Sequence, residues 1–185
     1  ITDLHTRCGL TERVWANHCA DLRPLELPAS DPGRAQVRRA FVVESMPETP
    51  AGADLVAATM LWLAREFDCD SFDVAYRGSV LDAVLQGLEP WFETLPPLRI
   101  EIPADTDVAA AAGAVRAAID SHDRRGTFLR DIVHRYAAVR GRDETWSARR
   151  LGVAIVVGTA ANRHDREAAL VLEVVPERGG WVWHA

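Results

Sequence analysis

The chain has 185 residues, of which 48% are hydrophobic and 26% charged, with a formal net charge of -6. This composition is typical of one globular domain with an ordinary core, and it excludes global disorder. The acidic balance excludes a surface that follows nucleic-acid phosphates, and the absence of any lysine excludes Schiff-base and P-loop chemistry.

The first third of the chain alternates helix signals with proline-rich breaks. Residues 9–20 are predicted to form a short helix capped by Thr11, followed by an extended connector over 21–34 that contains three prolines. A strand is predicted over 35–45. Residues 53–67 then carry apolar side chains at the spacing of a buried helix face.

The middle of the chain continues the alternation of strands and helices. Residues 72–76 alternate as a strand does, and residues 79–88 favour a helix. A strand over 98–102 precedes a helix over 107–121 that is rich in small residues. A further helix is predicted over 128–140.

The last third is dominated by β signals. The apolar run 151–157 predicts a strand buried on both faces, and residues 168–175 and 181–184 predict a hairpin. Altogether the pattern indicates an α/β fold, a mixed sheet of about six strands with about five helices in a single domain.

The cysteines bear on the cellular compartment. Their number, three, is odd, and no C-x-x-C pair occurs. We expect reduced thiols in a cytoplasmic protein, with no membrane partner, because no signal peptide and no apolar run of about 20 residues is present.

One segment resembles a known sequence motif. Residues 91–102 read W-F-E-T-L-P-P-L-R-I-E-I, which is similar to the "GxFxNTLPLR" strand of nonribosomal peptide synthetase condensation domains. Further segments resemble that family in the same order: Trp15 with the LELP run 25–28, then 55–67, 72–77, 122–129, 151–159 and 168–183. The departures are Glu93 in place of the motif's asparagine, an inserted Pro97 and the loss of a proline near Gly126.

The resemblance covers only the C-terminal lobe of such a domain, half of a chloramphenicol acetyltransferase-like fold. It implies that residues 1–34 are the helix and connector between the lobes and that residues 35–185 are the C-terminal lobe. The other lobe, which carries the family's HHxxxDG motif, is missing, and the first residue is Ile1; both lead us to expect a truncated segment of a longer chain.

No catalytic, cofactor or metal residue is predicted. The six histidines are scattered, and none has the histidine neighbour and Asp-Gly pair of HHxxxDG. The cluster of His5, Cys8, His18 and Cys19 fits zinc poorly, because adjacent residues on a helix diverge by about 100°. His122 matches a structural position of the family, and Trp91 in the strand motif is expected to be packed.

The resemblance without its catalytic half implies an inactive, truncated condensation-like domain that serves as a structural or interaction platform. Its partners would be the adenylation and carrier domains of the same synthetase, with phosphopantetheine on the carrier, or a recruited tailoring enzyme. The alternative is one half of an active condensation enzyme completed by a separate or upstream lobe. A free-standing acyltransferase lacks a nucleophile–base signature.

A half-fold without its partner lobe should carry apolar contact surface, so we expect a homodimer in isolation or a docked neighbour. The side chains predicted for that interface are apolar or aromatic: Trp15, Leu25, Leu27, Trp181 and Trp183.

Overall fold

The structure is a computed structural model, and it describes residues 2–27, 40–42, 52–137, 139, 151–158, 168–175 and 180–184. Within these residues there are five helices and six strands. The helices are α1 (Thr2–Ala20), α2 (Gly52–Glu66), α3 (Ser79–Leu85), α4 (Val108–Arg125) and α5 (Ile132–Arg135). The strands are β1 (Ala40–Val42), β2 (Ser71–Arg77), β3 (Pro97–Glu101), β4 (Val153–Val157), β5 (Leu170–Val175) and β6 (Gly180–His184).

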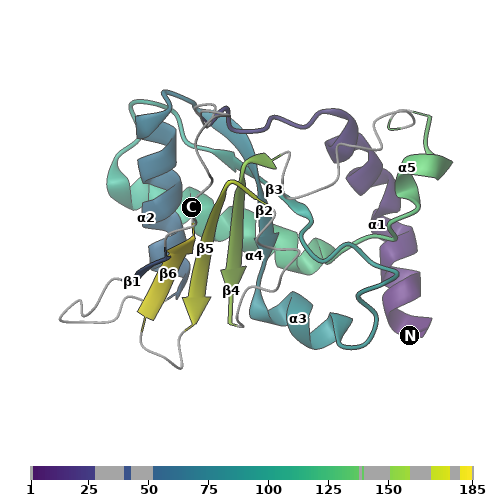
Figure 1. Cartoon of the computed structure of the whole chain (residues 1–185). Coiled ribbons are helices and arrows are strands. Elements are labelled where there is room, and N and C mark those ends of the chain that lie inside the picture. Colours follow the sequence, from purple (N-terminus) through teal and green to yellow (C-terminus); the bar gives the residue numbers. More distant parts are fainter. Residues whose placement is uncertain are drawn as a thin grey trace, which may run out of the picture.

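The six strands form one mixed sheet in the order β1-β6-β5-β4-β2-β3 (Figure 1). The central strands β2, β4 and β5 are parallel, and the other pairs are antiparallel. The α/β class and the predicted number of elements are confirmed in the part of the chain described. β4 lies in the middle of the sheet and is buried over Val153–Val156, as its apolar run predicts.

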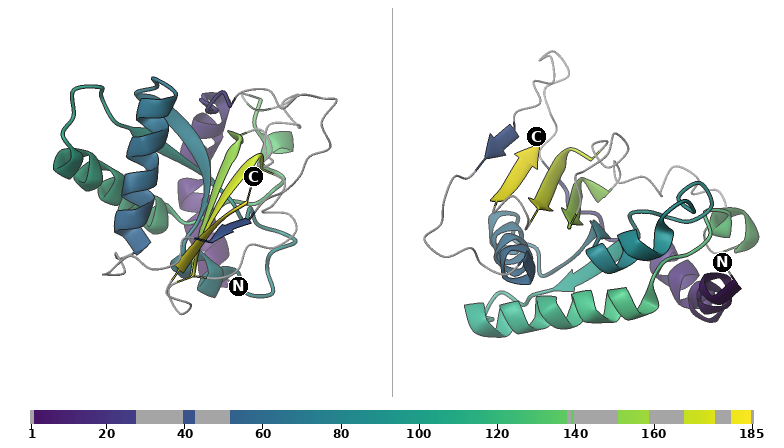
Figure 2. Two further views of the ribbon diagram at one scale, coloured as in Figure 1. Left: turned by 60° about the vertical axis from the view of Figure 1, so that its left-hand side comes forward. Right: turned by 90° about the horizontal axis from the view of Figure 1, so that it is seen from below.

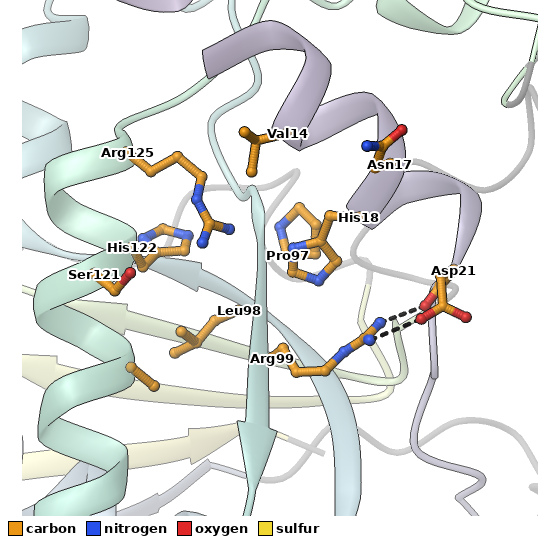
Figure 3. Close-up of a pocket in the computed structure, with 11 residues that line it drawn as sticks. Val14, Asn17, His18, Asp21, Pro97, Leu98, Arg99, Ser121, His122 and Arg125 are labelled. Carbon is orange, nitrogen blue, oxygen red and sulfur yellow. Dashed lines mark hydrogen bonds and ion pairs between the residues drawn. The ribbon is translucent and has the colours of Figure 1, made fainter.

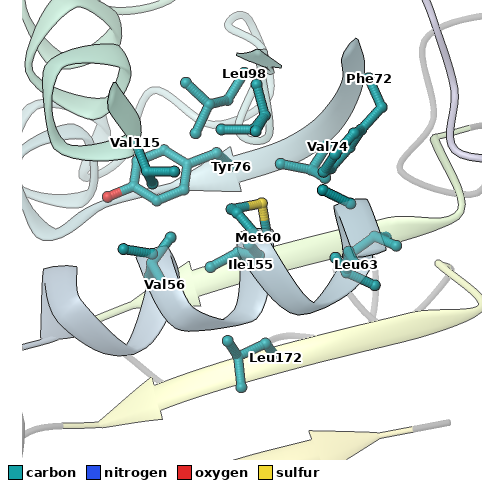
Figure 4. Packing of buried hydrophobic residues seen from close by; sticks show 14 of the residues in the cluster. Val56, Met60, Leu63, Phe72, Val74, Tyr76, Leu98, Val115, Ile155 and Leu172 are labelled. Carbon is teal, nitrogen blue, oxygen red and sulfur yellow. The ribbon is translucent and has the colours of Figure 1, made fainter. Parts of the chain in front are cut away.

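The main core lies between the sheet and two helices, α2 and α4, which cover the same face (Figure 2). From α2, Val56, Met60 and Leu63 are completely buried and point towards β2, where Phe72 and Val74 face them (Figure 4). Burying each such side chain contributes about 1.5–3 kcal/mol to folding, so this layer fixes the sheet on which the site is built.

Helix α4 has well-defined ends. Asp107 caps its start by accepting a hydrogen bond from the Ala110 amide at 2.8 Å. The helix ends at Gly126, which takes a φ of 71° and donates its amide to the His122 carbonyl. Residues 122–125, expected to belong to the link between two long helices, are therefore the last turn of α4.

Two predicted helices differ from the structure. Helix α1 begins at Thr2 rather than near residue 9, and Thr11 lies inside it, its hydroxyl donating to the Cys8 carbonyl at 3.4 Å. In the described part of the helix predicted over 128–140, helix is confined to the four residues of α5. Its expected first turn is extended instead, because Leu129 forms a β-bridge with Phe92.

The bridge between Phe92 and Leu129 also explains the position of Trp91, for which the prediction of a packed side chain is wrong. Its side chain is 69% exposed, whereas the neighbouring Phe92 is buried. Phe92 packs with Leu81 and Leu85 of α3 and with Cys8 of α1. Adjacent residues in extended chain point in opposite directions, so burial of Phe92 turns Trp91 outwards.

Candidate functional site

A pocket of about 520 Å³ opens between α1 and α4 above the edge strand β3, and we call it the α1–α4 pocket (Figure 3). Helix α1 contributes side chains from its last two turns, β3 its first three residues, and α4 its last two turns. The lining residues are Val14, Asn17, His18, Asp21, Pro97, Leu98, Arg99, Ala118, Ser121, His122 and Arg125.

Behind this pocket lies a fully buried carboxylate, Asp73 of β2. One of its oxygens accepts from His18 Nε2 at 2.8 Å and from Arg99 Nε at 3.1 Å. The other accepts from Arg99 Nη2 at 2.8 Å and from the Arg23 amide at 2.7 Å. Burial alone would raise the pKa of Asp73, but the hydrogen bonds from His18 and Arg99 outweigh it and lower the pKa below its ordinary value.

These contacts follow from the sheet register and from the end of α1. Asp73 and Arg99 are directly opposite each other on the antiparallel strands β2 and β3. Arg99 reaches on to Asp21, just past α1, with Nη1 at 3.0 Å from its carboxylate. The hydrogen bonds with Asp73 raise the pKa of Arg99, so the guanidinium is permanently charged. The network ties α1 to two strands.

His122 occupies the wall of the pocket on α4 and is 3% exposed. Its ring meets Tyr76 and Trp15 edge-on, with centroid distances of 5.2 Å and 5.6 Å. Burial lowers the pKa of His122 despite the opposing effect of Asp123, whose Oδ1 lies 3.8 Å from Nδ1. The imidazole is therefore neutral at pH 7.

Arg125 lies one turn beyond His122 and projects towards α1 (Figure 3). Its guanidinium carbon is 5.0 Å from the centroid of the Trp15 ring, a cation–π contact. Burial lowers the pKa of Arg125. In the described part of the chain it forms no ion pair with any acidic side chain.

The thiols are not arranged for nucleophilic chemistry. Burial raises the pKa of Cys19, so its thiolate is not accessible. Cys8 donates its thiol to the Thr127 carbonyl at 3.2 Å. Cys8 and Cys19 belong to different apolar clusters, and no group of three potential metal ligands occurs among the described side chains. No described helix is long and apolar enough to cross a membrane.

The side chains predicted for an interface separate into three groups. Trp15 and Leu25 are 0% and 4% exposed, so the expectation that they offer contact surface is wrong. Trp15 is covered by Phe128, Ile132 and the end of α4, because α1 packs against the chain itself. Leu27 is partly buried against the main core. The side chains of Trp181 and Trp183 lie outside the described part, although their backbones form β6.

Comparison with solved structures identifies the fold. The chain aligns with the starter condensation domain of rhizomide synthetase RzmA in a mutant complex with C8-CoA and Leu-SNAC, with a TM-score of 0.60 and 16% identity. A second mutant complex, with C8-CoA, gives 0.59 and 16%, and a protein named CT gives 0.53 and 15%.

The alignments cover 94–97% of this chain but only 44–47% of those proteins, so the chain spans less than half of their length. No protein-family model matches the chain, and no curated protein matches its sequence. At this identity the comparison shows architecture alone: the chain has the α/β fold of about half of the RzmA starter condensation domain.

Proposed function

We propose that the chain is the C-terminal lobe of a condensation-like domain that does not catalyse peptide-bond formation and that serves a synthetase as a structural or interaction platform. The fold supports the condensation-domain context, and the printed sequence contains no HHxxxDG motif. Its partners in this role are the adenylation and carrier domains of the synthetase, or a tailoring enzyme recruited to them.

The observation that carries the proposal is the packing of the two histidines, His18 and His122, in the α1–α4 pocket. A base for condensation must face a substrate amine with its accepting nitrogen. His18 instead donates to the buried Asp73 while its ring stacks on Trp15 at 5.9 Å. His122 is enclosed by aromatic rings and is neutral. Both side chains hold α1 and α4 on the sheet, which supports a scaffolding role.

The test compares the complete synthetase with a form from which this segment is deleted. We expect deletion to lower the yield of soluble protein, the rate of amino-acid adenylation and the recovery of partners by crosslinking. Equal solubility, adenylation and crosslinking in the two forms would refute the platform role.

The alternative is one half of an active enzyme whose other lobe brings HHxxxDG. It is favoured by the coverage, since the chain matches only 46–47% of the RzmA domain. A condensation assay on the complete protein with carrier-bound aminoacyl substrates separates the two. If the alternative is correct, the assay yields a condensation product, and replacing the first or second histidine of that motif stops its formation. If the platform role is correct, this domain forms no product.

A further inference from the structure

The α1–α4 pocket contains two guanidinium groups with different surroundings. Arg99 is neutralised by Asp73 and Asp21. Arg125 has no acidic partner among the described residues. Its guanidinium instead lies over the face of the Trp15 ring. One positive charge in the pocket is therefore not balanced by the fold.

The position of Arg125 makes an unpaired positive charge there energetically unfavourable. The side chain is partly buried at the end of α4, and burial lowers its pKa because a charged guanidinium loses hydration there. An anion entering the pocket would restore the lost solvation. A guanidinium presents a planar fork of N–H donors that matches the two oxygens of a carboxylate.

Buried polar atoms beside Arg125 also lack close partners. Among the described residues, the indole Nε1 of Trp15 makes no hydrogen bond. The ring nitrogens of His122 have only loose ones, Asp123 Oδ1 at 3.8 Å from Nδ1 and the backbone of Pro96. His122 is 3% exposed and lines the pocket directly, while the Trp15 ring lies against both His122 and Arg125. Buried groups of this kind in folded proteins nearly always have a partner, so these atoms indicate an occupant that the chain itself does not provide.

The rest of the lining limits what the occupant can be. Val14, Leu98 and Ala118 form an apolar wall, and about 520 Å³ suits a small molecule rather than a polymer. The surrounding acids Asp21 and Asp123 disfavour more than one negative charge. Among the described residues, the pocket thus has one cation without an acidic partner, two polar side chains (Asn17 and Ser121) and an apolar wall. This lining matches a monoanion with an aliphatic portion.

We infer that the α1–α4 pocket binds a small monocarboxylate with an aliphatic side chain. Arg125 binds the carboxylate, His122 hydrogen-bonds to a polar group of the ligand, and the aliphatic part packs on Val14 and Leu98. This binding activity goes beyond the platform role and does not depend on it.

The test is a titration of the purified chain with N-acetylleucine, followed by calorimetry and by the indole N–H resonances in ¹H–¹⁵N NMR spectra. The uncharged N-acetylleucinamide and inorganic phosphate serve as comparison probes. Arg125→Gln removes the carboxylate partner. Arg124→Gln is the matched control, because it removes the same charge from the adjacent, exposed position of the same helix, outside the pocket.

We expect N-acetylleucine to bind and to shift the Trp15 indole resonance. Loss of a charge-assisted hydrogen bond should weaken binding at least about tenfold in Arg125→Gln, and by much less in Arg124→Gln. Circular dichroism checks that both variants are folded. The inference is overturned by absent binding at millimolar concentration, by equal binding of the carboxamide or phosphate, or by equal losses in the two variants.

Discussion

At the scale of single residues, Asp73 has the clearest energetic role. It is completely buried and accepts hydrogen bonds from both His18 and Arg99. Replacing it by Asn leaves the Arg99 charge without its buried partner, which typically costs about 3–5 kcal/mol. We expect Asp73→Asn to lower the free energy of unfolding in urea by about 3 kcal/mol.

Asp21 provides the matched control, because it pairs with the same arginine but its side chain is 64% exposed. Exposed ion pairs contribute little, since water screens them. Asp21→Asn should therefore unfold at nearly the urea concentration of the original protein. Equal effects of the two substitutions would show that burial of Asp73 is not what makes the network stabilising.

His122 gives a prediction on pH. Its pKa in the folded chain lies below its ordinary value of 6.5 because of burial, so the unfolded chain binds the proton more readily. Stability contributed by the neutral ring is complete above pH 6.5 and is lost as the pH falls from there towards the lower folded value. The slope for one such proton is at most about 1.4 kcal/mol per pH unit.

The variant His122→Phe keeps an aromatic ring beside Tyr76 but cannot be protonated. Urea unfolding between pH 7 and pH 5 should show a flatter pH dependence for this variant than for the original chain. Parallel curves would mean that other groups cause the acid sensitivity.

The polar network was not predicted from the sequence, and the reason is physical. Alternation along residues 72–76 correctly predicts a strand, with Phe72 and Val74 on one face. It places Asp73 on the opposite face, where a carboxylate would ordinarily meet water. That face is covered by the end of α1, some 50 residues away in the chain. No local pattern in the sequence reports such a contact.

At the scale of elements, α1 offers a test of its unexpected length. Gly9 lies in the middle of the helix, and a Cβ added there would meet nothing within 4 Å. Alanine in a helix interior is favoured over glycine by roughly 0.5–1 kcal/mol. Gly9→Ala should raise the free energy of unfolding by that amount, whereas a helix that began after Gly9 would show no gain.

Gly158, at the end of β4, should respond in the opposite way. Its φ is 101°, and an added Cβ would lie 2.8 Å from the Cβ of Ser79 at the start of α3. Gly158→Ala should therefore destabilise the chain by more than about 1 kcal/mol, because both the backbone and the packing are incompatible. A neutral effect in chemical denaturation would contradict the close approach of β4 and α3.

Elements with strong periodicity were predictable, and elements defined by a distant partner were not. The apolar faces of residues 53–67 and 151–157 correspond directly to α2 and β4. Residues 128–140 also have a helical pattern, yet Leu129 pairs with Phe92, and among the described residues of this range only Ile132–Arg135 is helical. The gain from packing Phe128 and Ile132 around Trp15 outweighs the local helix preference.

At the scale of the whole molecule, apolar side chains remain exposed to solvent and could form contacts with another chain. Trp15 and Leu25, which were predicted to form such contacts, are buried in the chain's own core. On α3, Val80 and Val84 are 55% and 36% exposed, and they border a groove shared with Leu4 of α1. Contiguous exposed apolar side chains of this kind favour association, whereas single ones do not.

We therefore expect the isolated chain to associate in a concentration-dependent way, as measured by light scattering. Val80→Gln combined with Val84→Gln should shift the population towards monomer if the α3 surface mediates contact, and Trp181→Ala combined with Trp183→Ala should do so if β6 mediates it. Val108→Gln is the control, because Val108 is 71% exposed at the far end of α4 and lines neither the groove nor the α1–α4 pocket. A monodisperse monomer at high concentration would refute self-association. Under the proposed platform role, the apolar surface would then be covered by a neighbouring domain, which crosslinking of the complete protein at Val80 would detect.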